Sequence, residues 1–416
     1  MKRVVIVSAK RTPFGKFRGA LAKFSPIDLA VIAGKAALSG LDRTQIDQVI
    51  LGNVLSAGHG MNLARQVARH LDLPIETTAT TVNLMCGSGM QSALMAVSAI
   101  RAGEARAILV GGTESMSQTP LLIARPAKGE DPELSTVIDS MKRDGLVDTF
   151  SHCHMGEQAE ELAIAFGSSR AAQDTLAQRS QRLYRAALSR GSFADELVTA
   201  GDLNVDEHPR PEITSADLAK LQPAFQKLGR PGSVTAGNSS GINDGAAVLL
   251  LAELQFAESN DWPILAEWID GVVVGCDPAR MGLGPVPAIQ RLMQRTGCRW
   301  TDIDTLEINE AFSAQTLACL SQLELKLDPG LEATTVHTAD GHAIHFNREG
   351  GAIAIGHPLA ASGARLLTHL AWMIARGNSQ AGIAALCIGG GMGIATLLVT
   401  PKNKHPSTSL LSHIPT

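Results

Sequence analysis

Residues 356–375 read GHPLAASGARLLTHLAWMIA, a glycine-bearing turn that opens a long apolar helix. A similar turn and helix occur earlier, where NLMCGSGM at 83–90 precedes QSALMAVSAIRA. Two further pairs of segments recur in the same order, DQVILGNVL at 47–55 with DTLEINEAF at 304–312, and AILVGGTESM at 107–116 with ALCIGGGMGI at 385–394. Each pair alone is a weak match, but their common order indicates a duplicated architecture.

The expected strands are short, continuous apolar runs such as VVIV, AILV and AALCI. This pattern is typical of strands that helices cover on both faces, so we predict two α/β halves with buried sheets. The stretch 118–245 between them is richer in charged and polar residues. We predict a helix at 169–190 there, with Ser169 as its N-cap and Gly191 as its stop. The insertion is expected to lie over the strand ends, where ligands bind in open α/β sheets.

The composition excludes several classes of protein. The 416 residues are 18% charged and 45% hydrophobic, with a formal net charge of −4. This balance gives no reason to expect nucleic acid or an anionic membrane as a partner. The six cysteines contain no CxxC pair, which argues against a disulfide framework and favours a reducing cytoplasm. The N-terminal apolar run is too short for a signal peptide or a membrane span and predicts a first β-strand.

Histidines gather in two places that could suggest a metal. His337, His342 and His345 lie in the irregular stretch 325–346, without helical spacing or partner carboxylates, so we predict a solvated loop. In the sequence HCH at 152–154, adjacent side chains point in different directions, which disfavours a metal site. We therefore expect no metal.

Four polar residues stand at the ends of the predicted elements. Cys86 precedes one helix, where unpaired N–H groups and the helix dipole favour a thiolate, and His357 precedes the matching helix. Asn309 follows one strand and Cys387 ends another. A thiolate, a base and an oxyanion donor are the groups that nucleophilic acyl transfer needs. Taken singly, Cys86 and His357 would suit buried core positions, and Asn309 would suit a turn.

Together with their neighbours, these segments resemble the thiolase family along almost the whole chain. The resemblance runs from RTPFGKFRGAL at 11–21 to the last predicted strand near 399. Between them lie, in order, GGTESMS (111–117), HMG (154–156), VTAGNSSGINDGAA (234–247), GLGP (282–285), NEAF (309–312), GHP (356–358) and CIGGGMG (387–393).

The resemblance implies a five-layered α/β/α/β/α fold built from two duplicated halves with mixed sheets. The N-terminal half would comprise 1–117 and 246–270, and the C-terminal half 271–400. A loop domain at 118–245 would bind coenzyme A, and 401–416 would form a surface tail. A homodimer or homotetramer is also implied.

The resemblance assigns chemical roles to five residues. Cys86 would take an acyl group from acyl-CoA as a thioester, and His357 would activate it. Cys387 would remove or return the α-proton of acetyl-CoA. Asn309, through a bound water, would form one oxyanion hole with His357. The backbone N–H groups of Cys86 and Gly389 would form the other.

The family pattern also implies where acyl-CoA would bind, as a substrate rather than a permanent cofactor. Arg210 would meet the adenine end, Phe225, Ala236 and Ser240 would line the pantetheine channel, and His154, Met155, Met281 and Phe312 would shape the acyl end. Without the motif matches, Arg210 would be interpreted as a solvated surface residue, and the others as core side chains or ordinary turn residues.

The implied activity is that of an acetyl-CoA C-acetyltransferase, which joins two acetyl-CoA into acetoacetyl-CoA plus CoA or cleaves short 3-ketoacyl-CoA. Ala360, Arg348 and Glu349 depart from the family pattern, and 325–346 is longer than expected, so a degradative thiolase for medium or long chains stays open. A decarboxylating condensing enzyme would need His or Asn in place of Cys387. A cysteine hydrolase would release free acid, and a non-catalytic CoA-binding protein would not need both cysteines and His357.

Overall fold

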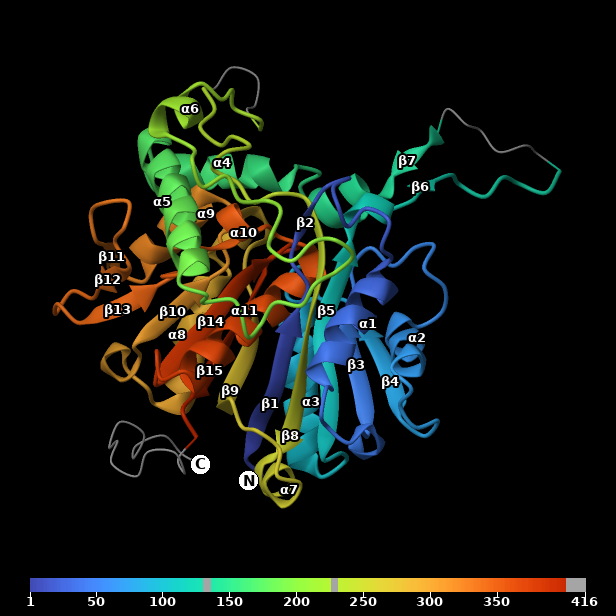
Figure 1. The fold of residues 1–416 in the computed structure, drawn as a ribbon. Coiled ribbons are helices and arrows are strands. Elements are labelled where there is room, and N and C mark those ends of the chain that lie inside the picture. Colours follow the sequence, from blue (N-terminus) through green and yellow to red (C-terminus); the bar gives the residue numbers. More distant parts are fainter. Residues whose placement is uncertain (130–135, 226–230, 402–416) are drawn as a thin grey trace.

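The computed structural model describes residues 1–129, 136–225 and 231–401 (Figure 1). All but the first residue of the predicted surface tail therefore lies outside the described residues. Along the described ranges, no helix combines the length and apolar character that crossing a membrane requires.

The strands of both halves belong to one mixed sheet of 13 strands. In the N-terminal part, β3 (Gln48–Gly52) runs parallel to β4 (Thr78–Val82) and β5 (Ala107–Ser115), and β5 pairs antiparallel with β8 (Asn243–Glu253). In the C-terminal part, β10 (Thr305–Ile308) runs parallel to β13 (Ala343–Phe346) and β14 (Ala381–Ile388), and β14 pairs antiparallel with β15 (Met392–Val399). The two parts repeat one pairing scheme, as the duplicated sequence segments predict.

The two parts of the sheet meet at one seam. There β1 (Val4–Arg11), which also pairs with β8, lies antiparallel to β9 (Ala266–Gly275), which pairs with β15. Strand β9 spans the predicted boundary at 270. The short strand β2 (Gly15–Lys16) pairs with β8.

Helices divide the molecule into five layers, and this confirms the predicted fold class. Helices α3 (Ser88–Ala102) and α11 (Leu359–Ala375) share one hydrophobic core with strands of both parts, so the sheet is folded around them. Helices α1 (Pro26–Ala37) and α2 (Leu63–His70) cover the outer face of the N-terminal part. Helices α8 (Pro285–Thr296) and α9 (Ser313–Gln322) cover that of the C-terminal part. The short helices α7 (Leu254–Ser259) and α10 (Ala352–Ile355) connect elements.

The inserted segment lies over one end of the sheet, at the top of Figure 1. Its helices are α4 (Met155–Ala165), α5 (Arg170–Ser189) and α6 (Ser215–Ala219), and β6 (Leu121–Leu122) and β7 (Ile138–Asp139) form a separate extension. The Ser169 hydroxyl accepts the N–H of Ala172 at 3.2 Å, and Gly191 adopts a φ of 72° just beyond the helix. The predicted helix at 169–190 and its caps are therefore confirmed.

The prediction of a solvated loop at 325–346 is wrong. The segment contains β11 (Lys326–Leu327), β12 (Thr335–His337) and β13, which extend the sheet beyond β10. Buried residues alternate with more exposed ones in the two longer strands, and Val336, Ile344 and Phe346 are fully buried. His337 faces Asp328 with a nitrogen–oxygen distance of 3.0 Å. Among the described residues, no group of three or more His, Cys, Asp or Glu could hold a metal ion.

Candidate active site

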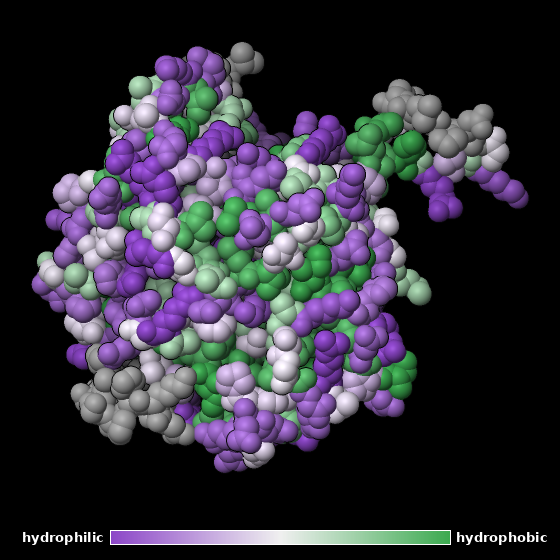
Figure 2. Space-filling view, in the orientation of Figure 1, coloured by the Kyte–Doolittle hydropathy of each residue, from purple (hydrophilic) through white to green (hydrophobic). Residues whose placement is uncertain are grey.

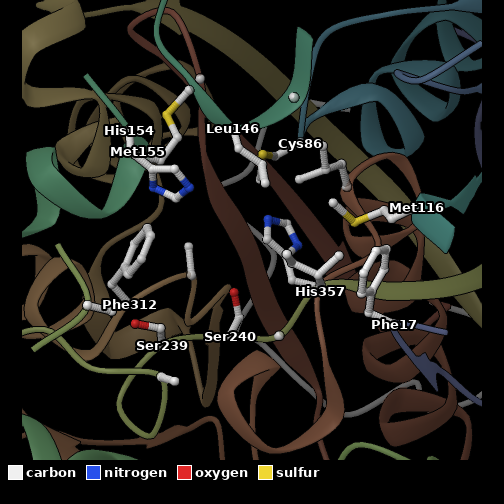
Figure 3. A pocket seen from close by; sticks show the side chains of 18 of the residues that line it. Phe17, Cys86, Met116, Leu146, His154, Met155, Ser239, Ser240, Phe312 and His357 are labelled. Carbon is white, nitrogen blue, oxygen red and sulfur yellow. The ribbon is translucent and has the colours of Figure 1, made fainter. Parts of the chain in front are cut away.

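A cavity of about 550 Å³ opens between the inserted segment and the strand ends (Figure 3). Of the site residues named from the sequence, only Asn309 does not line this cavity. The named residues that line it are Cys86, His154, Met155, Arg210, Phe225, Ala236, Ser240, Met281, Phe312, His357, Cys387 and Gly389. In Figure 3 the Cys86 sulfur and the His357 ring lie on one side, across from His154 and Phe312. Residues more than 250 positions apart in the sequence thus share one cavity.

A tight turn holds Cys86 just before α3. Met85 adopts a left-handed φ of 46°, which non-glycine residues rarely take. The Ser88 hydroxyl accepts the N–H of Leu84 at 2.8 Å and donates to the carbonyl of Met85 at 2.6 Å. These bonds close the turn around Cys86, so its half-buried side chain faces the cavity.

The glycines near Cys86 permit close packing between the two halves. A Cβ added at Gly89 would lie 2.4 Å from the carbonyl oxygen of Ala360, and one at Gly112 would lie 1.9 Å from the same oxygen. Glycine at both positions lets α3 and β5 approach the first turn of α11. This packing role supplements the turn that the sequence predicts.

A hydrogen bond fixes the tautomer of His357. Its Nδ1 lies 2.5 Å from the Ser362 hydroxyl, and that hydroxyl donates its proton to the carbonyl of Pro358 at 2.9 Å. Nδ1 must therefore be the donor to Ser362, which leaves Nε2 as the unprotonated nitrogen. Burial, and then the positive charge of Arg365, lower the pKa of His357 to about 4. His357 is thus a neutral imidazole at neutral pH, with Nε2 able to accept a proton.

Both cavity cysteines are protonated in these surroundings. Burial raises the pKa of Cys86 to about 11, while the backbone N–H groups of Gly389 and Cys86 itself act in the opposite direction. The prediction of a lowered pKa for Cys86 is therefore wrong, because loss of water outweighs the N–H groups. Burial raises the pKa of the 2% exposed Cys387 well above its ordinary value, and the nearby Cys86 adds to this effect.

Asn309 lies next to the cavity wall rather than in it. It is fully buried, and both polar atoms of its carboxamide have no hydrogen-bond partner among the described residues. Its neighbour Glu310 is held by Ser180 and Asn347, while Ala311 and Phe312 line the cavity. A buried carboxamide without a protein partner suits an ordered water molecule.

Aromatic and sulfur-containing side chains form the opposite wall. The His154 ring stacks on Phe225 with centroids 4.7 Å apart, and Phe225 meets Phe312 edge-on. His154 is also the N-cap of α4, because its Nδ1 accepts the N–H of Gly156 at 3.1 Å. The Cys387 thiol shares an apolar cluster with Met155, Met281 and the two phenylalanines. This wall is suited to an apolar group beside the thiols.

Basic side chains line the mouth of the same cavity. Lys16, His208 and the exposed Arg210 lie there. Burial, and then the charges of Arg210 and Lys16, lower the pKa of His208 to about 4, so it is neutral. The mouth therefore carries two positive charges that suit a phosphorylated ligand.

The sequence interpretation missed several lining residues. Lys16, Phe17, Met116 and Ser239 lie within motifs that carry the resemblance, so their positions could have been included. Leu146, His208 and Leu359 also line the cavity, and no sequence signal singles out Leu146 or His208.

Glu114 was also missed, and it connects the halves behind Cys86. Its buried carboxylate accepts the backbone N–H groups of Val54, Leu55 and Ala360 at 3.0–3.2 Å. Burial raises its pKa to about 7 despite these bonds. Its only sequence signal is its position in GGTESMS.

Comparisons with known proteins agree with this architecture. The family model described as "Thiolase, N-terminal domain" matches residues 4–255, and "Thiolase, C-terminal domain" matches residues 262–400. A probable acetyl-CoA acetyltransferase of Escherichia coli is 42% identical over 405 residues, which cover 95% of this chain and 98% of the relative. An acetyl-CoA acetyltransferase of Pseudomonas aeruginosa is 42% identical over 409 residues, covering 96% and 99%.

Solved structures are also similar over almost the whole chain. The crystal structure of human mitochondrial 3-ketoacyl-CoA thiolase in complex with CoA is 38% identical, with a TM-score of 0.86, and covers 96% of this chain and 98% of that one. The crystal structure of the Bacillus anthracis acetyl-CoA acetyltransferase is 36% identical, with a TM-score of 0.87. The match covers 96% of this chain and 99% of that one. Both family models, the full-length relatives and the folded architecture agree: this chain belongs to the thiolase family.

Proposed function

We propose that this protein is an acetyl-CoA C-acetyltransferase. It joins two acetyl-CoA into acetoacetyl-CoA plus CoA, and it runs the reverse thiolysis of short 3-ketoacyl-CoA. The observation that carries the proposal is that Cys86, His357, Cys387 and Gly389 line one cavity in a thiolase fold. The full-length acetyl-CoA acetyltransferase relatives support the same activity.

Acyl transfer begins at Cys86. Nε2 of His357 accepts the thiol proton while the sulfur attacks the thioester carbonyl, and CoA leaves as a thiol after taking a proton from Cys387. The backbone N–H groups of Cys86 and Gly389 stabilise the developing oxyanion. Their influence on the pKa of Cys86 supports this role, because both N–H groups lie close enough to bond the sulfur. The product is an acetyl thioester on Cys86.

Condensation follows with a second acetyl-CoA. The Cys387 thiolate removes an α-proton, and the carbanion attacks the acetyl carbonyl on Cys86. Acetoacetyl-CoA forms as the bond between the acetyl carbon and the Cys86 sulfur breaks. The released Cys86 thiolate then regains a proton from His357. Nε2 of His357 and a water held by Asn309 donate to the enolate oxygen, which fits the unpartnered Asn309 carboxamide. Such donors are needed because an α-proton beside a thioester is weakly acidic.

The inserted segment at 118–245 supplies the CoA site in this proposal. Arg210 and Lys16 at the mouth attract the phosphorylated end, and Phe225, Ala236 and Ser240 line the path of the pantetheine arm. His154, Met155, Met281 and Phe312 enclose the acyl group. We further propose a homodimer or homotetramer, as membership of the thiolase family implies, and a place in the cytoplasm, where the six free cysteines would stay reduced.

Acyl-chain specificity is the decisive experiment. We would measure thiolysis of 3-ketoacyl-CoA substrates from four to sixteen carbons, and follow acetylation of Cys86 by intact mass after adding acetyl-CoA. The proposal predicts a thioester adduct and the highest kcat/KM for acetoacetyl-CoA. A maximum at long chains would identify the degradative enzyme instead. Release of free acetate without CoA-dependent exchange would identify a hydrolase and refute the proposal.

A further inference from the structure

A second cavity of about 230 Å³ lies away from the catalytic one and shares no lining residue with it. Four arginines and one glutamate supply its charge. Arg182 and Arg185 come from α5, Arg190 is the C-cap of that helix, and Arg348 comes from the segment after β13. Figure 2 shows strongly hydrophilic side chains over the region of α5. From these features we propose that this cavity is a binding site for a small, multiply charged phosphate anion.

The C-terminal half of α5 gathers several positive charges close together. Arg182 and Arg185 are three residues apart, so their side chains are neighbours on one face of α5, and Arg190 follows at the end of the helix. Like charges at this spacing repel each other. An anion that contacts several guanidinium groups would relieve this repulsion, and their planar donors suit phosphate oxygens.

The acidic groups nearby neutralise the arginines only in part. Arg185 pairs with Glu212 at 2.5 Å, but the side chains are 49% and 81% exposed. Arg182 lies 4.0 Å from Glu332, whose side chain is 86% exposed, and Arg190 lies 3.8 Å from Glu349. Exposed pairs of this kind contribute little to stability. A multivalent anion can therefore replace the two exposed glutamates.

A buried arginine holds the two walls of the cavity together. Arg179, 1% exposed, donates to the carbonyl of Ala333 at 2.8 Å and to that of Phe346. It thereby ties α5 to the segments that carry Thr334 and Arg348, both of which line the cavity. The Arg348 side chain is further held by the carbonyl of Asn378 at 3.2 Å. The site is thus largely formed before any ligand arrives, which lowers the entropic cost of binding.

The test is calorimetric titration of the full chain with inorganic diphosphate at low ionic strength. We expect binding to the wild type, and at least about tenfold weaker binding by the double variant Arg182→Gln/Arg348→Gln. The exposed Arg299, which lies outside this cavity, provides the matched control variant Arg299→Gln, which should bind like the wild type. The double variant should keep its thiolysis activity, which shows that it folds.

A second variant separates this site from the mouth of the catalytic cavity. Lys16→Gln/Arg210→Gln should retain diphosphate binding, because those residues line the other cavity. ADP should bind to Lys16→Gln/Arg210→Gln no more tightly than diphosphate does, since no aromatic side chain among the described residues lines the second cavity to stack on an adenine ring. The proposal is overturned if the wild type does not bind diphosphate. Binding that persists in Arg182→Gln/Arg348→Gln, or that disappears in Lys16→Gln/Arg210→Gln, also overturns it.

Discussion

Replacing Ser362 with alanine tests the role of His357 without touching the cavity wall. The Ser362 hydroxyl accepts the Nδ1 proton of His357 at 2.5 Å and is 1% exposed. Alanine removes this acceptor. The α-helix itself keeps its first-turn bond, because the backbone N–H of residue 362 also donates to the carbonyl of Pro358. The substitution should therefore change the imidazole while leaving α11 in place.

The size of the effect follows from the lost bond. A buried donor without a partner costs about 1–3 kcal/mol. This cost falls on the tautomer that presents an unprotonated Nε2 to Cys86, so the population of the competent tautomer falls. Each 1.36 kcal/mol changes a rate by about tenfold, so kcat should decrease roughly 5- to 150-fold. KM for acetoacetyl-CoA should change little, because Ser362 does not line the cavity.

Steady-state thiolysis of acetoacetyl-CoA and the rate of Cys86 acetylation measure this effect. Ser92→Ala is the matched control, since Ser92 is a fully buried serine of α3 that bonds backbone groups and does not line the cavity. It should keep most of its kcat. An unchanged kcat in Ser362→Ala, or an equal loss in both variants, would refute the argument for tautomer control.

Three further outcomes are expected. Cys86→Ala should abolish acetyl transfer and thiolysis, and full activity of this variant would exclude Cys86 as the nucleophile. Cys387→Ala should still form the acetyl thioester on Cys86 in intact-mass measurements, more slowly because CoA then leaves without a proton from Cys387, but it should lose condensation; a complete failure to acetylate would contradict the role of Cys86 as the sole nucleophile. Burial disfavours the charged form of His369, yet the carboxylates of Glu196 and Glu349 raise its pKa overall. The wild type should therefore be more stable than His369→Gln below the ordinary histidine pKa of about 6.5 and lose this advantage as pH rises through the raised value, which thermal unfolding across pH would reveal.

The sequence predicted those parts of the molecule whose structure is decided by residues close together in the chain. Apolar runs became buried strands, and the α5 caps at Ser169 and Gly191 lie where their residue types predict. Apart from Asn309, the residues named from the family resemblance line one cavity, because most of the motifs stand at strand and helix ends. The segment 325–346 was missed, since its strands are only two to four residues long and its histidines masked the alternation of buried Val336, Ile344 and Phe346.

Electrostatics could not be predicted from the sequence. A helix start favours a thiolate at Cys86, but the opposing effect of burial depends on residues from distant parts of the chain. The position of Asn309 could not be predicted either, because its place beside the cavity rather than in its wall depends on how distant segments pack. The cluster of arginines around the second cavity also needs the folded chain, because Arg348 is more than 150 residues away from Arg182 in the sequence.

The duplicated halves support each other's proposed catalytic residues in a reciprocal way. Near the end of β5, Glu114 from the first half accepts the N–H of Ala360, which fixes the start of α11 just after His357. Directly after β14, Gly389 from the second half directs its N–H at the sulfur of Cys86, just before α3. In each case a strand end of one half positions the helix start of the other. Neither half alone could therefore position both the proposed base and the proposed nucleophile. The site needs both halves, which meet at the central pair of helices.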